Sequence, residues 1–131
     1  MMEADLHEIH FILFVADQER ATAFYSSVLA CAPVLHVPGM TAFELRPGVR
    51  RGLMPASGAR RLLGAHGPRP EGLPAAPRSE LYLVVADAEA CHARALAAGA
   101  AEVSPLAARD WGHRAAYARD PDGHVLAFAE A

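Results

Sequence analysis

Residues 10–17 read HFILFVAD and residues 80–87 read ELYLVVAD, and this repeated pattern decides the fold. Each copy is an apolar run that ends at an aspartate, Asp17 or Asp87. A run that is apolar on both faces is typical of a strand covered on both sides. Aspartate is a favoured helix N-cap because its carboxylate accepts from the free N–H groups of the first turn. The pattern therefore predicts a strand followed by a helix, twice in one chain.

The residues after each aspartate predict one helix and three further strands. In the first half the helical face has i, i+3, i+4 spacing and consists of Ala21, Phe24, Tyr25, Val28 and Leu29. In the second half the predicted helix ends at Gly99, as a C′ glycine would. Turn residues such as Pro and Gly separate the strands, which we expect at 34–37, 41–46, 49–54, 101–104, 113–119 and 124–129. Both halves therefore read β-α-β-β-β.

The two halves predict a single domain, residues 1–131, built from two copies of one module. Module one spans 7–55 and module two spans 79–131. The connector, 56–78, is rich in Gly and Pro and is expected to have little regular structure beyond one helical turn around Arg60–Leu63. His10 precedes Asp17 by the same spacing as Glu80 precedes Asp87, so His10 and Glu80 occupy equivalent places.

Composition limits the function classes. The chain has 131 residues, 53% of them hydrophobic, and a formal net charge of −3. All 12 basic residues are arginine, which excludes Schiff-base and phosphate-loop lysines. The mild acidity argues against a nucleic-acid partner. No apolar run reaches the length of a membrane span, and the acidic N-terminus does not read as a signal peptide. Cys31 and Cys91 form no disulfide pattern, so we expect a cytoplasmic protein without a membrane partner.

With these features the sequence resembles the vicinal oxygen chelate superfamily, which includes glyoxalase I, bleomycin-resistance proteins and extradiol dioxygenases. The residues that carry the resemblance are HFILFVAD (10–17), FYSSVLA (24–30), ELYLVVAD (80–87), the helix end at 98–100 and WGHRAAYARDPDGHVLAF (111–128). The resemblance implies an α+β fold in which two βαβββ modules form curved half-barrel sheets around a cavity. It also implies a homodimer.

Metal-using members of the superfamily hold a divalent ion on four inward side chains, and this chain matches that pattern only in part. His10 matches the first ligand place and Glu80 the third. The second place falls on Leu53 or Met54, and the fourth on Ala127. Neither aliphatic nor thioether side chains suit a hard ion, and two ligands are too few for a tight site. We therefore expect no cofactor, with a divalent metal on His10 and Glu80 as the alternative.

The residues expected to contact a ligand come from both modules. His10 and Glu80 facing one another across the cavity would form a hydrogen-bonded pair. Trp111, the only tryptophan, would form a lip that stacks on a planar ligand, or would simply pack its loop. Spacing leaves open whether His113, Tyr117 and Arg119 or the alternate residues of that strand face the cavity. The expected ligand-binding residues are His10, Phe14, Phe43, Glu80, Tyr82, Trp111, His113 and Tyr117.

Three further acidic residues receive structural interpretations. Asp120 and Asp122 lie in an Asp-Pro-Asp-Gly turn, whose proline and glycine explain both carboxylates as turn residues. Glu44 is expected to point to solvent.

Three functions remain as hypotheses. The first is a protein that binds a small molecule in an apolar, aromatic-lined cavity with an incomplete metal site. The second is a metal-dependent lyase, isomerase or dioxygenase acting on vicinal oxygens, so enzymatic activity stays open. The third is a module that mainly dimerises.

Overall fold

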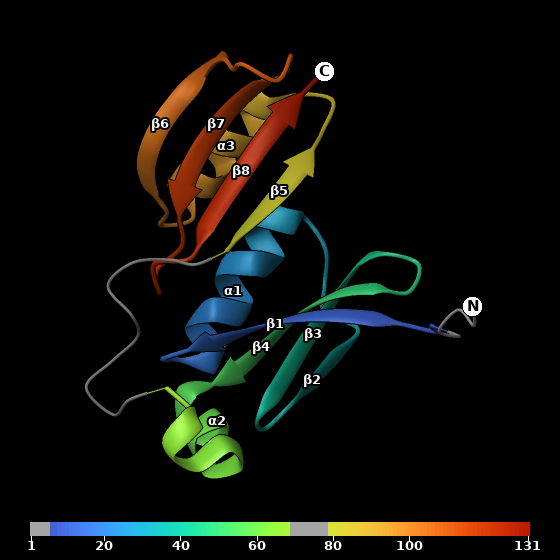
Figure 1. The fold of residues 1–131 in the computed structure, drawn as a ribbon, viewed down its shortest axis with the longest axis vertical. Helices are drawn as coiled ribbons and strands as arrows, with labels where there is room; N and C mark the ends of the chain where they lie inside the picture. The colour runs from blue at the N-terminus through green and yellow to red at the C-terminus, as the bar shows by residue number, and fades with distance from the viewer. Residues whose placement is uncertain (1–5, 69–78) are drawn as a thin grey trace. The chain divides into compact units, whose positions relative to one another are not determined.

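The computed structural model describes residues 6–68 and 79–131, and the α+β fold is the expected one. The described residues fall into two compact units. Unit 1 holds residues 6–22 and 31–68, and unit 2 holds residues 23–30 and 79–131. The boundary between the units therefore passes through the first helix, rather than through the connector alone. Figure 1 labels the elements of both units.

Unit 1 is built on a four-stranded mixed sheet in the order β1-β4-β3-β2. Its strands are β1 (Ile9–Val15), β2 (Leu35–Val37), β3 (Met40–Arg46) and β4 (Val49–Pro55). β1 runs parallel to β4, and the other neighbours are antiparallel. The strands lie where the sequence pattern predicts them, to within one or two residues.

The helix α1 (Gln18–Leu29) begins as its sequence predicts. Asp17 Oδ1 accepts from the backbone N–H of Arg20 at 3.0 Å, which is an N-cap bond. In the first turns of the helix, Gln18 Nε2 and Thr22 Oγ1 both bond Thr41 Oγ1 on β3, at 2.9 Å each. The helix ends four residues before Pro33, where Ala30 takes a left-handed φ of +53°.

The connector contains more structure than its Gly and Pro content predicted. Helix α2 (Ala56–Leu63) follows β4 directly, and a short 3-10 helix, η1 (Gly64–His66), follows α2. The prediction of a single turn at Arg60–Leu63 was therefore too short. The remainder of the predicted connector, 69–78, lies outside the described residues.

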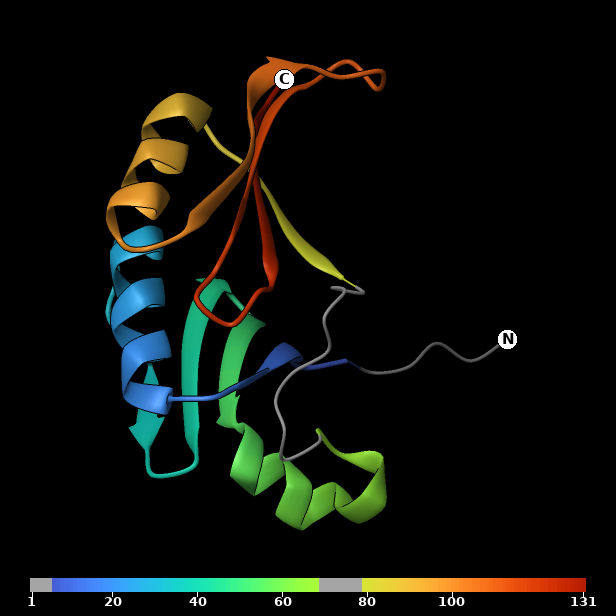
Figure 2. The same ribbon diagram turned by 90° about the vertical axis from the view of Figure 1, so that its left-hand side faces the viewer.

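Unit 2 repeats the topology of unit 1. Its strands β5 (Glu80–Val84), β6 (Ala101–Ala108), β7 (Arg114–Arg119) and β8 (Val125–Glu130) form a mixed sheet in the order β5-β8-β7-β6. Helix α3 (Ala88–Ala97) starts at Asp87, whose Oδ1 accepts from the N–H of Ala90 at 3.0 Å. Figure 2 shows α3 along one face of this sheet, with the β6–β7 hairpin bending away from the helix.

The second half of α1 belongs to unit 2 through specific contacts. Tyr25 is fully buried, and its hydroxyl donates to Asp120 Oδ2 at 2.6 Å. Arg94 of α3 donates to the carbonyl of Val28 at 3.0 Å. The core on the helix side of the sheet includes Leu126 and Phe128 of β8. One helix thus supplies structure to both units.

Candidate functional site

Strand pairing in unit 1 sorts the predicted residues onto two faces of the sheet. His10, Ile12 and Phe14 alternate along β1 and share one face, with Arg50, Gly52 and Met54 as their partners on β4. The other face carries the core, to which Leu13, Val15, Thr41, Phe43 and Leu53 belong. Phe43 has no exposed surface and lies on the core face, so it does not share the His10 face as a cavity wall would require.

His10 forms a polar cluster within its own unit. Its Nε2 lies 2.8 Å from Glu8 Oε1, and Arg50 Nη1 lies 3.9 Å from the same oxygen. The hydrogen bond from His10, followed by the charge of Arg50, holds the pKa of the Glu8 carboxyl below its usual value. The expected pairing of His10 with Glu80 joins residues of different units and stays a prediction.

The internal repeat relocates the second ligand place. Tyr82 pairs with Ala127 across β5 and β8, and the equivalent pair across β1 and β4 is Ile12 with Gly52. The second place therefore corresponds to Gly52, and not to Leu53 or Met54 as expected. A Cβ at Gly52 would lie 2.9 Å from Ile12 Cγ1, so the Ile12 side chain takes the space that a ligand side chain would need.

A resident metal ion does not fit these residues. Gly52 and Ala127 provide no donor atom, and the space beside Gly52 is taken. Across residues 6–68 and 79–131, no three His, Cys, Asp or Glu side chains are grouped as an ion would require. Glu44 is exposed, and its Oε1 accepts from the N–H of Gly48 at 3.2 Å, so it serves the adjacent turn.

Strand register in unit 2 sorts residues 113–119 onto the two faces of the sheet. Tyr117 pairs with Ala127, which in turn pairs with Tyr82, so all three share one face. Ala116 and Ala118 pair with Phe128 and Leu126 and face the core under α3 instead. Ala127, the fourth ligand place, thus lies between two tyrosines.

Four predicted residues come together on this face as an aromatic cluster, which consists of Tyr82, Trp111, His113 and Tyr117. Trp111 Nε1 donates to Tyr82 Oη at 2.8 Å, and Tyr82 Oη lies 2.8 Å from His113 Nδ1. The Tyr82 and His113 rings stack with centroids 5.9 Å apart and planes at 20°. Trp111 as a whole residue remains 57% exposed, so the cluster is open to solvent on that side.

Arg109, which the sequence did not single out, supports the cluster from the hairpin between β6 and β7. Its guanidinium lies over the Tyr117 ring, 5.1 Å from the centroid. Burial, the charge of Glu80 and the neighbouring Tyr82 raise the pKa of Tyr117 above its usual value, and Arg109 partly offsets this. An arginine before a Trp-Gly turn gives no spacing signal, because the contact depends on how the hairpin closes.

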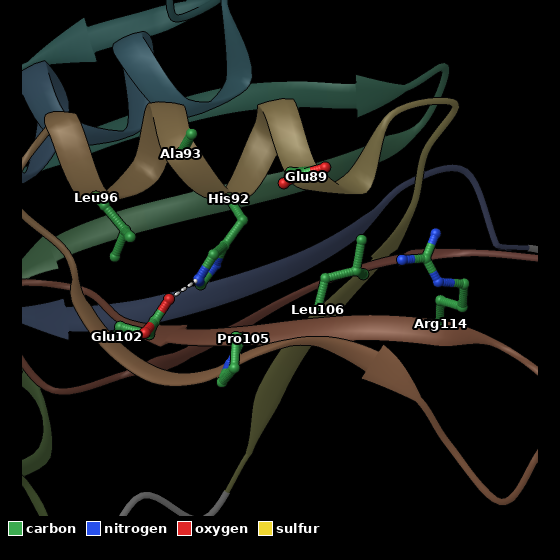
Figure 3. A pocket seen from close by; sticks show the side chains of 8 residues that line it. All are labelled: Glu89, His92, Ala93, Leu96, Glu102, Pro105, Leu106 and Arg114. Atoms are coloured by element: carbon green, nitrogen blue, oxygen red, sulfur yellow. Dashed lines mark hydrogen bonds and ion pairs between the residues drawn. The ribbon is translucent and has the colours of Figure 1, made fainter.

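A cavity of about 300 Å³ lies on the opposite side of the unit 2 sheet, between α3 and β6 (Figure 3). It contains a buried histidine, His92, whose Nε2 lies 2.9 Å from Glu102 Oε2. Arg114 Nη1 at its margin bonds Glu130 Oε1 at 3.1 Å. Its lining residues are Glu89, His92, Ala93, Leu96, Glu102, Pro105, Leu106 and Arg114. Most of its charged groups therefore already have partners, and it lies away from the aromatic cluster's face.

Comparison with known proteins identifies the family. The model of the Glyoxalase/Bleomycin resistance protein/Dioxygenase superfamily matches residues 9–128, so the chain belongs to this superfamily. No curated protein matches the chain. No helix in the described part of the chain is long and apolar enough to cross a membrane.

Solved structures share the fold at low sequence identity. A glyoxalase-related enzyme from Fulvimarina pelagi superposes with a TM-score of 0.79 at 23% identity, over 93% of this chain and 86% of that one. A glyoxalase/bleomycin resistance protein/dioxygenase family enzyme from Burkholderia phytofirmans PsJN gives 0.76 at 16% identity, over 97% and 98%. Hypothetical protein SA1046 from S. aureus gives 0.78 at 19% identity, over 100% and 95%. These similarities concern the fold alone.

Proposed function

We propose that this superfamily member binds a planar small molecule at the aromatic cluster and needs no resident metal ion to do so. The observation that carries the proposal is the position of Ala127 between Tyr82 and Tyr117. Where metal-using relatives place a ligand side chain, this chain has a methyl group flanked by two aromatic rings. Aromatic rings with a few polar groups at their edges are typical linings of small-molecule sites.

The exposed indole of Trp111 makes the proposal directly testable. Because Trp111 is the only tryptophan, its fluorescence reports on the cluster and on no other part of the chain. A thermal-shift screen of planar aromatic compounds should yield ligands that also change this fluorescence. Tyr82→Ala should weaken their binding, whereas His36→Ala in unit 1 should leave it unchanged. Ligands that bind the wild type and the Tyr82→Ala variant equally would contradict the proposal.

The alternative is a metal-dependent lyase, isomerase or dioxygenase. The observation in its favour is a pair of metal-ligand side chains at the start of β1. Glu8 and His10 lie 2.8 Å apart and are exposed, so they could contribute to a weak ion site. Elemental analysis of protein purified without chelator decides between the two proposals. We expect less than one ion per chain and no change with His10→Ala or Glu80→Ala. One ion per chain that both variants lose would establish a metal site and overturn the proposal of metal-free binding.

We also propose that the protein forms a homodimer. Two large apolar side chains on one face of β1, Ile9 and Phe11, are substantially exposed, and Leu6 just before the strand is exposed as well. Exposed apolar groups that are contiguous often mark an interface. Light scattering coupled to size-exclusion chromatography should give twice the mass of one chain, and Phe11→Ser should lower it. A wild-type mass of one chain at all concentrations would rule out the dimer.

A further inference from the structure

We propose that the aromatic cluster selects ligands that carry an oxyanion, with the Nε2–H group of His113 as the hydrogen-bond donor. This inference rests on the proposed function, because it names the ligand class of the same site. It follows from the direction of two hydrogen bonds and from the charges around them.

The hydrogen bonds of Tyr82 assign the tautomer of His113. An indole Nε1–H can only donate, so Tyr82 Oη must accept from Trp111. Among the described residues, the only other partner of Tyr82 Oη is His113 Nδ1, at 2.8 Å. We assign the phenolic hydrogen to this second bond, because Tyr82 Oη then uses its donor as well as its acceptor capacity, and Nδ1 acts as the acceptor. A neutral imidazole that accepts at Nδ1 carries its own hydrogen on Nε2.

The Nε2–H group of His113 is available to a ligand. No acceptor for it occurs in the part of the chain that the structure describes, and the residue is half-buried rather than buried. Its ring is fixed by stacking on Tyr82 as well as by the hydrogen bond at Nδ1. A ligand oxygen would thus meet a donor whose direction is already set, which reduces the entropic cost of binding.

Arg109 adds positive charge to the same part of the site. Its side chain donates to Ser104 Oγ and to the carbonyl oxygens of Pro105 and Ala115, all of which are uncharged. Within residues 6–68 and 79–131 it has no carboxylate partner. The N–H of Arg109 also bonds the carbonyl of His113 at 2.8 Å, so the two residues close one turn. An uncompensated guanidinium beside a fixed donor favours an anionic ligand group.

Glu80, the carboxylate on this face of the sheet, lies toward the end of β8 that is farther from His113. Glu80 pairs with Val125, whereas His113 precedes Arg114, which pairs with Glu130. These β8 positions are five residues apart, which corresponds to roughly 16 Å along a strand. Asp110 is the nearest carboxylate in sequence, and it is exposed in the turn. Glu80 still acts on Tyr117, whose pKa it raises, but its strand position is at the end of the sheet away from His113.

A matched pair of probes tests this inference. 4-Nitrophenolate carries an oxyanion on a planar ring, and 4-nitroanisole presents a similar ring without the charge. Both are titrated against Trp111 fluorescence, at a pH where the phenol is ionised. We expect the wild type to bind the phenolate at least tenfold more tightly, which is the order expected for a hydrogen bond to a charged group. His113→Phe should abolish that preference and retain the binding of the anisole, whereas His66→Phe should change neither.

The outcomes separate the two proposals. If neither probe nor any screened planar compound binds, the proposed function fails. If both probes bind the wild type equally, only the oxyanion inference fails. Because the His113→Phe variant could fail to fold, the tautomer is also measured in the wild type. Nitrogen-15 NMR of labelled histidine should show His113 protonated at Nε2 and not at Nδ1. A proton on Nδ1 would overturn the inference, and Tyr82→Phe should remove the fixed tautomer.

Discussion

The side chain of Asp120 accepts three hydrogen bonds in unit 2. Its Oδ1 accepts from the backbone N–H groups of Asp122 and His124 at 2.9 and 2.8 Å, which fixes the turn between β7 and β8. Its Oδ2 accepts from the buried hydroxyl of Tyr25 on α1. The sequence interpretation of Asp120 as a turn residue is confirmed by the first two bonds. The hydrogen bond to Tyr25 could not be predicted from the sequence, because the two residues are 95 positions apart.

Tyr25→Phe should destabilise the protein by about 1.5–3 kcal/mol, because it leaves a buried carboxylate oxygen without its donor. Tyr117→Phe is the matched control, since the Tyr117 hydroxyl has no hydrogen bond in the described part of the chain. That control should change the free energy of unfolding by less than about 0.5 kcal/mol. Urea denaturation followed by circular dichroism measures both. Equal stability of the two variants would contradict the assigned role of Asp120.

The lowered pKa of Glu8 predicts a pH dependence. His10 is the largest cause of the shift, so His10→Ala should raise the pKa of Glu8 toward its ordinary value. A carboxyl whose folded-state pKa is depressed stabilises the fold above its unfolded pKa, and this contribution is lost as the pH falls through the folded value. The stability difference between wild type and His10→Ala should therefore shrink in acid. Carbon-13 NMR titration of the Glu8 carboxyl gives the pKa directly, and an unchanged value in the variant would assign the shift to Arg50.

Four of the residues expected to bind a ligand lie together in the aromatic cluster, but their arrangement was not predictable from the sequence. Alternation on β5 placed Tyr82 correctly on the face opposite the core. The same logic could not place His113 and Tyr117, because β7 carries small residues at both parities and only its pairing with β8 decides. Phe43 was assigned to the ligand face although it is core, since an apolar ring suits either environment.

Among the elements, helix starts were the most predictable and irregular strands the least. Asp17 and Asp87 cap their helices by the bonds that their side chains predict. β6 extends to Ala108, four residues beyond the expected end, and its pairing with β7 is interrupted by two register shifts. The extension of β6 was not predicted because it contains Pro105, and proline normally argues against a strand interior.

The close packing of β1 against β4 predicts a coupling between Ile12 and Gly52. Gly52→Ala would bring a methyl group within 2.9 Å of Ile12 Cγ1, so the isoleucine must move. Ile12→Ala removes that atom and should make Gly52→Ala tolerable. In a double-mutant cycle we expect a coupling free energy of about 1 kcal/mol, measured by urea denaturation. Strictly additive effects would show that the Ile12 side chain is not what restricts Gly52.

At the scale of the whole molecule, the repeat in the sequence and the compact units in space do not coincide. The repeat predicts two modules with boundaries in the connector, 56–78. The compact units instead divide α1, so that 23–30 belongs with 79–131. The sequence contains no local signal for this, because the contacts of Tyr25 and Val28 are with partners far along the chain.

A fragment spanning 79–131 should therefore not fold by itself. It lacks Tyr25, the donor to Asp120, and the carbonyl of Val28 that Arg94 binds. Nuclear magnetic resonance spectra should show poor dispersion for this fragment. A peptide spanning 18–31, added in trans, should restore part of it, whereas the same peptide with Tyr25→Ala should not. A well-dispersed spectrum of the fragment alone would show that the helix is dispensable.

The bond between Trp111 and Tyr82 also has a kinetic consequence. A hydrogen bond near the surface contributes about 0.5–1.5 kcal/mol, so the Trp111 indole should be detached from Tyr82 for roughly a tenth to a third of the time. A ligand that enters beneath the indole would then find an open site often enough that its association slows by no more than about tenfold. In rapid-mixing experiments that follow Trp111 fluorescence, the observed rate constant should therefore rise linearly with ligand concentration, as for a simple bimolecular association.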